Sequence, residues 1–358
     1  MLLLLRTRTS AIDDKLPIMS SRRLFATLLF LFAWLWSACS NTSAVPTPTE
    51  SNPQSALESV ATSAPIESGD LDPACLGKDA AFAPFADDLT IYCDDVYMYI
   101  EADGLAEHEM MVGITAWNQQ VPIPQPFHDD NAWRIPLYPV MGDAPTATTG
   151  QGPIAVAING VMVYNPTQQS GIYDEDHDPH LIGELDNCGG HSGRADDYHY
   201  HIAPVCMEEL LAGYSDGELP IAYAIDGFPI YASVAGLELD GCQGAFDAEG
   251  NYAYYATPEY PYVNGCFSGE VDLSLQPATH PIRPAGEPIQ VLITALYEDA
   301  DGWNHLEYDY QGSQHSINYR MDDEECFEFE FVDDGASSAA AQTETYCQTS
   351  APPPQPVN

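Results

Sequence analysis

The chain has 358 residues and carries 54 acidic against 10 basic side chains, a formal net charge of −44 at pH 7. So negative a surface repels nucleic acids and anionic lipid headgroups, which makes both poor partners for the folded body. With 29 prolines, 26 glycines and few stretches of helical periodicity, the chain is expected to be mostly β with long loops.

The N-terminal residues have the features of an export signal. Arg22 and Arg23 precede an apolar run that ends in small residues and Cys39. This order resembles a bacterial lipoprotein signal, in which Cys39 is lipidated and becomes the first residue of the mature protein. We expect residues 1–39 to be the signal peptide, with Met19 as an alternative start, and the protein to be a lipoprotein at the cell surface or in the periplasm. The alternative is an uncleaved anchor, although the run is short for a span of about 20 residues.

Composition divides the rest of the chain into three parts. Residues 40–70 are rich in Ser, Thr, Pro and Ala and are expected to form a flexible linker. Short alternating runs bounded by turn residues fill 71–335, and the clearest of them is Cys326–Val332, which predicts one buried and one wet face. Because no linker-like break interrupts this region, we expect one domain of β-sheets and hairpins, followed by a tail over 336–358.

The cysteines support export. Apart from Cys39 there are eight, and an even number in an exported chain predicts disulfides. Although eight cysteines allow 105 pairings, we expect neighbours along the chain to be joined. The expected disulfides are Cys75–Cys93, Cys188–Cys206, Cys242–Cys266 and Cys326–Cys347. The chain contains no Cys-x-x-Cys motif, which argues against a thiolate metal site.

An internal repeat spans about 154–206 and 221–266. From Asp186 to Pro204 the first copy aligns without a gap with the second, at a constant offset of 54 residues (188 to 242, 200 to 254). The shared residues include an Asp, a Cys, a Gly, two Tyr and a Pro. Upstream, each copy has two apolar runs around an Asn-Gly or Asp-Gly turn, which predicts a hairpin. We therefore expect a duplicated β unit within one domain.

The two copies differ in three histidines. His191, His199 and His201 of the first copy are replaced in the second by two alanines and a tyrosine. In a strand, His199 and His201 lie on one face and the flanking tyrosines on the other. With His191 from a nearby turn they predict a three-nitrogen site for a divalent transition metal, zinc or copper, with a position left for water or substrate. The alternative is a set of surface histidines that only form hydrogen bonds.

The first copy also holds an acidic insertion that the second lacks. It contains His177 and His180, which are further candidate metal ligands. A metal-bound water needs a nearby proton acceptor if it is to act as a nucleophile. The candidate general bases in this part of the chain are Asp176, Asp178 and Glu184.

These motifs resemble the YHYH-domain family of exported proteins, named for the segment Tyr198–His201. Three further segments are similar to family signatures, namely Ala157–Gly160, Asn187–His191 and Asp226–Tyr231. The likeness extends over about residues 85–335. The resemblance implies an exported domain but no settled activity. Members often carry a second histidine-bearing copy, so this chain departs from the pattern. If the family has two metal sites, this chain is expected to keep one.

Three classes of function are compatible with these residues, and they leave open whether the protein is an enzyme. The first is a lipid-anchored domain that binds a transition metal. The second is a non-enzymatic carbohydrate-binding or adhesion module whose exposed aromatic rings stack on sugars. The third is a metal-dependent hydrolase or hydratase, in which zinc lowers the pKa of a bound water. The expected partners are the membrane, through the lipid anchor, and a small-molecule or glycan ligand.

Overall fold

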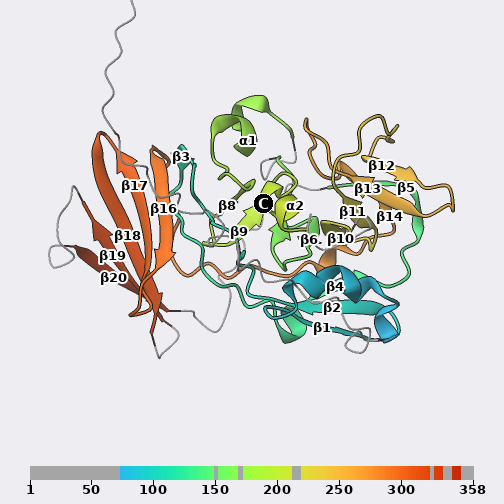
Figure 1. Ribbon diagram of the computed structural model, residues 1–358, viewed down its shortest axis with the longest axis horizontal. Coiled ribbons are helices and arrows are strands. Elements are labelled where there is room, and N and C mark those ends of the chain that lie inside the picture. Colours follow the sequence, from blue (N-terminus) through green and yellow to red (C-terminus); the bar gives the residue numbers. More distant parts are fainter. Residues whose placement is uncertain are drawn as a thin grey trace, which may run out of the picture. The chain divides into compact units, whose positions relative to one another are not determined.

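Strands dominate the described part of the chain, which confirms the expected mostly β fold (Figure 1). The computed structural model describes residues 73–148, 152–167, 172–211, 219–322, 326–333 and 341–347. The expected signal peptide with Cys39 and the expected linker lie outside these ranges. Within them, no helix has both the length and the apolar character needed to cross a membrane.

Five sheets make up the described strands. The three-stranded sheet has the order β1 (Thr90–Cys93), β2 (Tyr97–Glu101), β4 (Trp133–Pro136). The eight-stranded sheet has the order β12 (Gly244–Phe246), β13 (Tyr252–Tyr255), β11 (Pro229–Tyr231), β10 (Ala222–Ala224), β6 (Ala155–Ala157), β7 (Met162–Val163), β9 (Tyr198–Tyr200), β8 (Gly190–Ser192). Two small sheets pair β14 (Cys266–Gly269) with β5 (Met141–Ala147) and β15 (Ile289–Gln290) with β3 (Ala116–Trp117). The five-stranded sheet is consecutive: β16 (Leu292–Glu298), β17 (Asn304–Tyr310), β18 (Ser313–Met321), β19 (Cys326–Val332), β20 (Gln342–Cys347).

Helices are few and short. The α-helices are α1 (Pro179–Ile182) and α2 (Val205–Leu211). The 3₁₀ turns cover Pro73–Cys75, Lys78–Phe85, Asp129–Asn131, Glu175–His177 and Leu273–Leu275. Helix α1 and one of these turns lie in the acidic insertion of the first copy, so the insertion has regular structure of its own.

The eight-stranded sheet has the same strand pairing in both halves. In the first, β6 and β7 form a hairpin, β7 runs parallel to β9, and β9 is antiparallel to β8. Strands β10, β11, β13 and β12 repeat this arrangement, and β6 pairs with β10 where the halves meet. Val163 lies opposite Tyr200, and Ile230 lies opposite Tyr254 at the equivalent place. The pairing is the one that the predicted repeat requires, whereas its origin by duplication stays a prediction.

The glycine of each hairpin turn adopts a backbone conformation that other residues rarely take. Gly160 and Gly227 have φ angles of 80° and 92°, a region that strongly favours glycine. A Cβ at Gly160 would also lie 2.6 Å from a side-chain carbon of Leu89, and one at Gly227 would lie 2.8 Å from the carbonyl oxygen of Pro136. Each turn therefore packs tightly against an N-terminal strand or its flanking residues.

The four disulfides join the expected neighbours: Cys75–Cys93, Cys188–Cys206, Cys242–Cys266 and Cys326–Cys347. The last fastens β20 to β19, with its two cysteines opposite each other in the ladder. Strand β20 lies within 336–358, for which only a tail was expected. Backbone pairing to β19 and the disulfide hold this segment in the sheet, although its own side chains are largely exposed.

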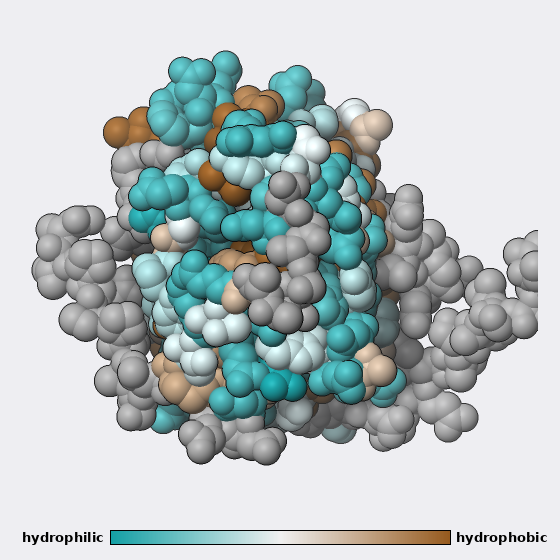
Figure 2. All heavy atoms as spheres, turned by 90° about the vertical axis from the view of Figure 1, so that its left-hand side faces the viewer, coloured by the Kyte–Doolittle hydropathy of each residue, from teal (hydrophilic) through white to brown (hydrophobic). Residues whose placement is uncertain are grey.

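The strands bury their apolar side chains and expose their charged ones to solvent. In β19, Phe327 and Phe329 are buried while Glu328 and Glu330 are more exposed, as the alternation predicts. Across the face seen in Figure 2, hydrophilic residues predominate. In β19 the apolar side chains thus lie in the core and the acidic ones lie toward the solvent.

Candidate metal centre

Three imidazoles converge where β8 and β9 meet. His191 lies directly opposite His199 in the antiparallel pair, and His201 follows β9. The Nε2 atom of His201 lies 3.1 Å from that of His191 and 3.1 Å from that of His199. Two nitrogens bound to one metal at about 2.0–2.1 Å with a tetrahedral angle are about 3.3 Å apart. The nitrogens thus already have the spacing of a metal site.

Backbone carbonyls orient two of the rings. Nδ1 of His199 lies 2.9 Å from the carbonyl oxygen of Asp197, and Nδ1 of His201 lies 3.0 Å from that of Asn165. A carbonyl only accepts, so each Nδ1 carries the hydrogen and each Nε2 presents its lone pair toward the centre. The Asp197 carboxylate also lies 3.3 Å from Nδ1 of His199. Carbonyl and carboxylate partners of this kind fix the tautomer of metal-bound histidines.

Two of the three histidines are held in the neutral form. Burial, and then the neighbouring imidazoles, lower the pKa of His191 and of His201 well below the usual histidine value. The neutral imidazole is the form that binds metals. His199 and His201 are buried, whereas His191, on the edge strand β8, is partly exposed. A substrate or water would therefore approach from the His191 side.

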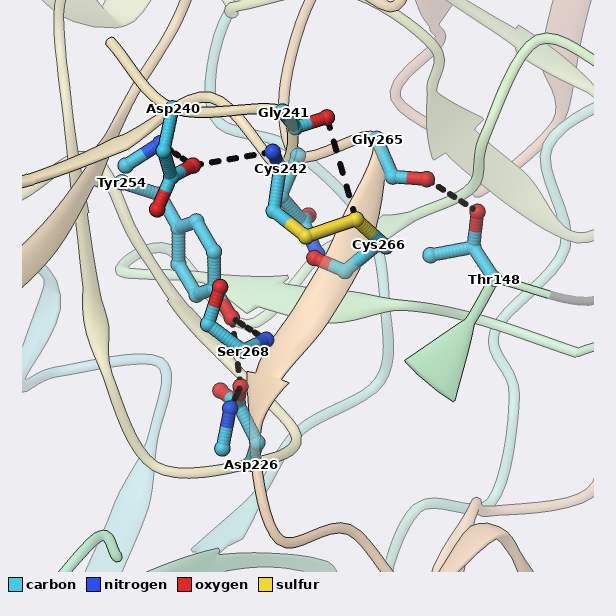
Figure 3. The surroundings of a disulfide bond; sticks show 12 residues. Thr148, Asp226, Asp240, Gly241, Cys242, Tyr254, Gly265, Cys266 and Ser268 are labelled. Carbon is cyan, nitrogen blue, oxygen red and sulfur yellow. Dashed lines mark hydrogen bonds between the residues drawn. A yellow bond between two sulfur atoms is a disulfide. The ribbon is translucent and has the colours of Figure 1, made fainter. Parts of the chain in front are cut away.

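The turn before β8 is held by Asp186. Its carboxylate accepts hydrogen bonds from the backbone N–H groups of Cys188 and Gly190 and from the Tyr198 hydroxyl. In the second half, Asp240 accepts the equivalent bonds, of which the one from Cys242 is drawn in Figure 3. Both halves share this framework, so Asp186 has a structural role, as its recurrence in the repeat predicts.

The second half has the framework without the ligands. Ala245 lies opposite Ala253 in the register that His191 and His199 occupy in the first half. Tyr255, at the place of His201, stacks on Tyr231. This half therefore offers no imidazole, which agrees with the expectation of one site.

The histidines of the acidic insertion do not join the triad. Nδ1 of His177 lies 2.9 Å from Asp174, and the His180 ring packs against Tyr262. Among the described residues, the group of nearby metal-ligating atoms at this centre contains only His191, His199 and His201. His177 therefore has its partner within the insertion, whereas His180 packs on a tyrosine of the second half.

The three candidate bases have different surroundings. Asp178 is fully buried, caps the N-terminus of α1, and accepts hydrogen bonds from the Tyr173 and Tyr262 hydroxyls, so it is structural. Asp176 is exposed. Burial raises the pKa of Glu184, and the nearby His199, Arg194 and His177 side chains partly offset this shift. Glu184 is therefore the candidate base whose pKa is influenced by a triad histidine.

One of three comparisons with known proteins found a match. Residues 132–238 match the family model described as YHYH protein. The match confirms the resemblance and contains the triad, although it is narrower than the expected 85–335. No curated protein and no solved structure was found to match the chain. The four disulfides together with the YHYH match indicate an extracellular protein.

Proposed function

We propose that the protein is an exported, lipid-anchored YHYH-domain protein that binds one divalent transition metal through His191, His199 and His201. The observation that carries the proposal is the convergence of three Nε2 atoms, two of them on rings whose Nδ1 hydrogens are engaged by carbonyls. Zinc and copper suit such imidazole ligands. Three protein ligands leave a further position for water or substrate.

Metal analysis of the purified protein tests this proposal. The wild type is expected to hold about one zinc or copper per chain, and a His199→Ala/His201→Ala variant is expected to lose it. His177→Ala/His180→Ala is a matched control, since it removes two histidines outside the triad and should keep the metal. Equal metal content in the wild type and the triad variant would show that the proposal is wrong.

The lipid anchor is tested separately. In a bacterial host, the wild type should be found with the membranes and should incorporate labelled fatty acid. Cys39→Ser should release the chain from the membrane fraction, because the thiol that receives the lipid is missing. A Cys39→Ser variant that stays with the membranes would favour an uncleaved N-terminal anchor instead.

A metal-dependent hydrolase or hydratase is the second candidate, and Glu184 favours it. A metal bound by the triad would lower the pKa of a coordinated water. Burial raises the pKa of Glu184, which makes this carboxyl better able to accept and return a proton than an ordinary glutamate. If the protein is such an enzyme, Glu184→Gln should keep the metal and lose hydrolysis of activated esters, whereas Asp176→Asn should keep both.

A carbohydrate-binding role is supported by a different surface. Tyr92, Tyr99 and Arg134 lie side by side across β1, β2 and β4, and they line a cavity of about 750 Å³ together with aspartates. Aromatic faces with carboxylates and a guanidinium can hold sugar rings and their hydroxyls. Retention on polysaccharide columns that Tyr92→Ala abolishes, and that triad variants keep, would favour this role over metal chemistry.

A further inference from the structure

A second set of metal-ligating atoms lies outside the triad. A ring nitrogen of His108 and the sulfur atoms of Cys188 and Cys206 all lie within 4.8 Å of one another. The two sulfurs are joined in a disulfide, so they are not ligands in the oxidised protein. The absence of a Cys-x-x-Cys motif argued against a thiolate site, but the fold brings these three residues together from distant positions.

This cluster lies on the opposite side of β9 from the triad. The His108 ring packs near Tyr198 and Tyr200, and its Nε2 lies 2.6 Å from the Tyr200 hydroxyl. Because Tyr200 points away from the face that carries His199, the two sets of ligands do not compete for one position. The carbonyl oxygen of Glu109 lies 3.2 Å from Nδ1 of His108 and 3.8 Å from the sulfur of Cys188, so ring and sulfur share one neighbour.

Among the described residues, no histidine lies beside the equivalent disulfide in the second half of the repeat, Cys242–Cys266. In Cys242–Cys266, the Cys266 sulfur lies 3.8 Å from the carbonyl oxygen of Gly241, a contact like the one at Cys188 (Figure 3). In the described part of the chain, no third metal-ligating side chain accompanies this disulfide or the remaining two. The imidazole is therefore specific to Cys188–Cys206, and Cys242–Cys266 is a natural control.

We propose that reduction of Cys188–Cys206 creates a second metal site, in which both thiolates and the His108 imidazole bind Zn²⁺ or Cu⁺. An external dithiol supplies two electrons and two protons: its thiolate attacks the partly exposed Cys206, Cys188 leaves, and the dithiol becomes a disulfide. Metal binding then displaces the two thiol protons. The imidazole exchanges one of its present hydrogen bonds for a metal–nitrogen bond. Two thiolates and one imidazole are a soft ligand set that suits these ions.

This site does not rest on the proposed function of the triad, and the experiment separates the two. The full-length protein carrying His199→Ala/His201→Ala is reduced with a phosphine, freed of reductant without oxygen, and titrated with Co²⁺. Mass spectrometry after thiol alkylation identifies which disulfides have opened. The reduced protein should bind one Co²⁺ more than the oxidised protein and should show a thiolate-to-cobalt charge-transfer band.

Two further variants decide the assignment. His108→Ala should weaken this Co²⁺ binding roughly tenfold or more, because a ligand is lost, whereas Cys242→Ser/Cys266→Ser should leave it unchanged. The proposal is overturned if reduction adds no Co²⁺, if the band survives unaltered in His108→Ala, or if it disappears in Cys242→Ser/Cys266→Ser. Circular dichroism accompanies each titration, and loss of the folded spectrum on opening of Cys188–Cys206 would also overturn it, since the site needs the folded turn.

Discussion

The Nε2 atoms of His199 and His201 lie 3.1 Å apart, and the Nδ1 atom of each ring is hydrogen-bonded to a backbone carbonyl. Both rings thus present a lone pair to the same point, an arrangement that is repulsive unless a cation lies between them. Neighbouring backbone carbonyls orient both rings. We infer that these contacts preorganise the site, which leads to the first two predictions.

Gly193→Ala should weaken metal binding without unfolding the domain. A Cβ at this position would lie 2.5 Å from Cε1 of His199, so the ring would have to move away from its partners. Gly241→Ala is the control, because a Cβ there meets nothing within 4 Å. Competition with a chromophoric chelator measures the affinity. An equal loss of metal affinity in both variants, or no loss in either, would contradict the prediction.

Asp197→Asn should lower metal affinity by about 10–100-fold while all three ligands remain. The carboxylate lies 3.3 Å from Nδ1 of His199 and supports that ring's orientation and basicity. It also accepts a hydrogen bond from the backbone N–H of Ala195, so the thermal unfolding of the variant is measured alongside. Unchanged affinity in a folded variant would show that the Asp197 carbonyl alone orients the ring.

Lys78 should make stability rise between about pH 8 and pH 10. Burial, partly offset by Asp226, lowers the pKa of Lys78 to about 8, against 10.5 for the unfolded chain. Between these values the unfolded state binds more protons, so stability is lost as pH falls from 10.5 toward 8. Urea unfolding across this window should show the rise in the wild type and not in Lys78→Met. If the free energy of unfolding of the variant rises with pH as steeply as that of the wild type, groups other than Lys78 cause the rise.

The disulfide between β19 and β20 should stabilise the five-stranded sheet. Cys326 and Cys347 close a loop over a separation of 21 residues, worth about 3 kcal/mol on the chain-entropy model. Cys326→Ser/Cys347→Ser should therefore lower the free energy of unfolding by about that amount and raise hydrogen exchange in β20 first. Free thiols at these positions in the gently isolated wild type would refute the disulfide itself.

Stability should also increase with salt. The chain has many acidic and few basic side chains, which give it a net charge of −44. Like charges therefore repel one another across the folded surface. Salt at 0.1 M screens exposed charges beyond about 10 Å, so the melting temperature should rise from low salt upward. Thermal melts in sodium chloride measure this effect. A melting temperature that does not change with salt would mean that local pairing already offsets the repulsion.

Much of the site could be read from the sequence because its parts are close along the chain. His199 and His201 are two residues apart, and His191 lies on the adjacent antiparallel strand, so a strand and a turn suffice to bring them together. The neighbouring disulfides and the two glycine turns are local for the same reason. Comparison of the two copies then separates shared framework, such as Asp186 and its counterpart, from the histidines.

Other features depend on contacts between distant residues, which only the tertiary structure decides. His108 meets Cys188 and Cys206 because burial of the tyrosines of β9 requires a layer from earlier in the chain. His177 and His180 were plausible ligands by composition, but their insertion packs elsewhere, through the bond between Asp178 and Tyr262. Local pattern specified the residues that could bind a metal, whereas long-range packing selected which of them meet.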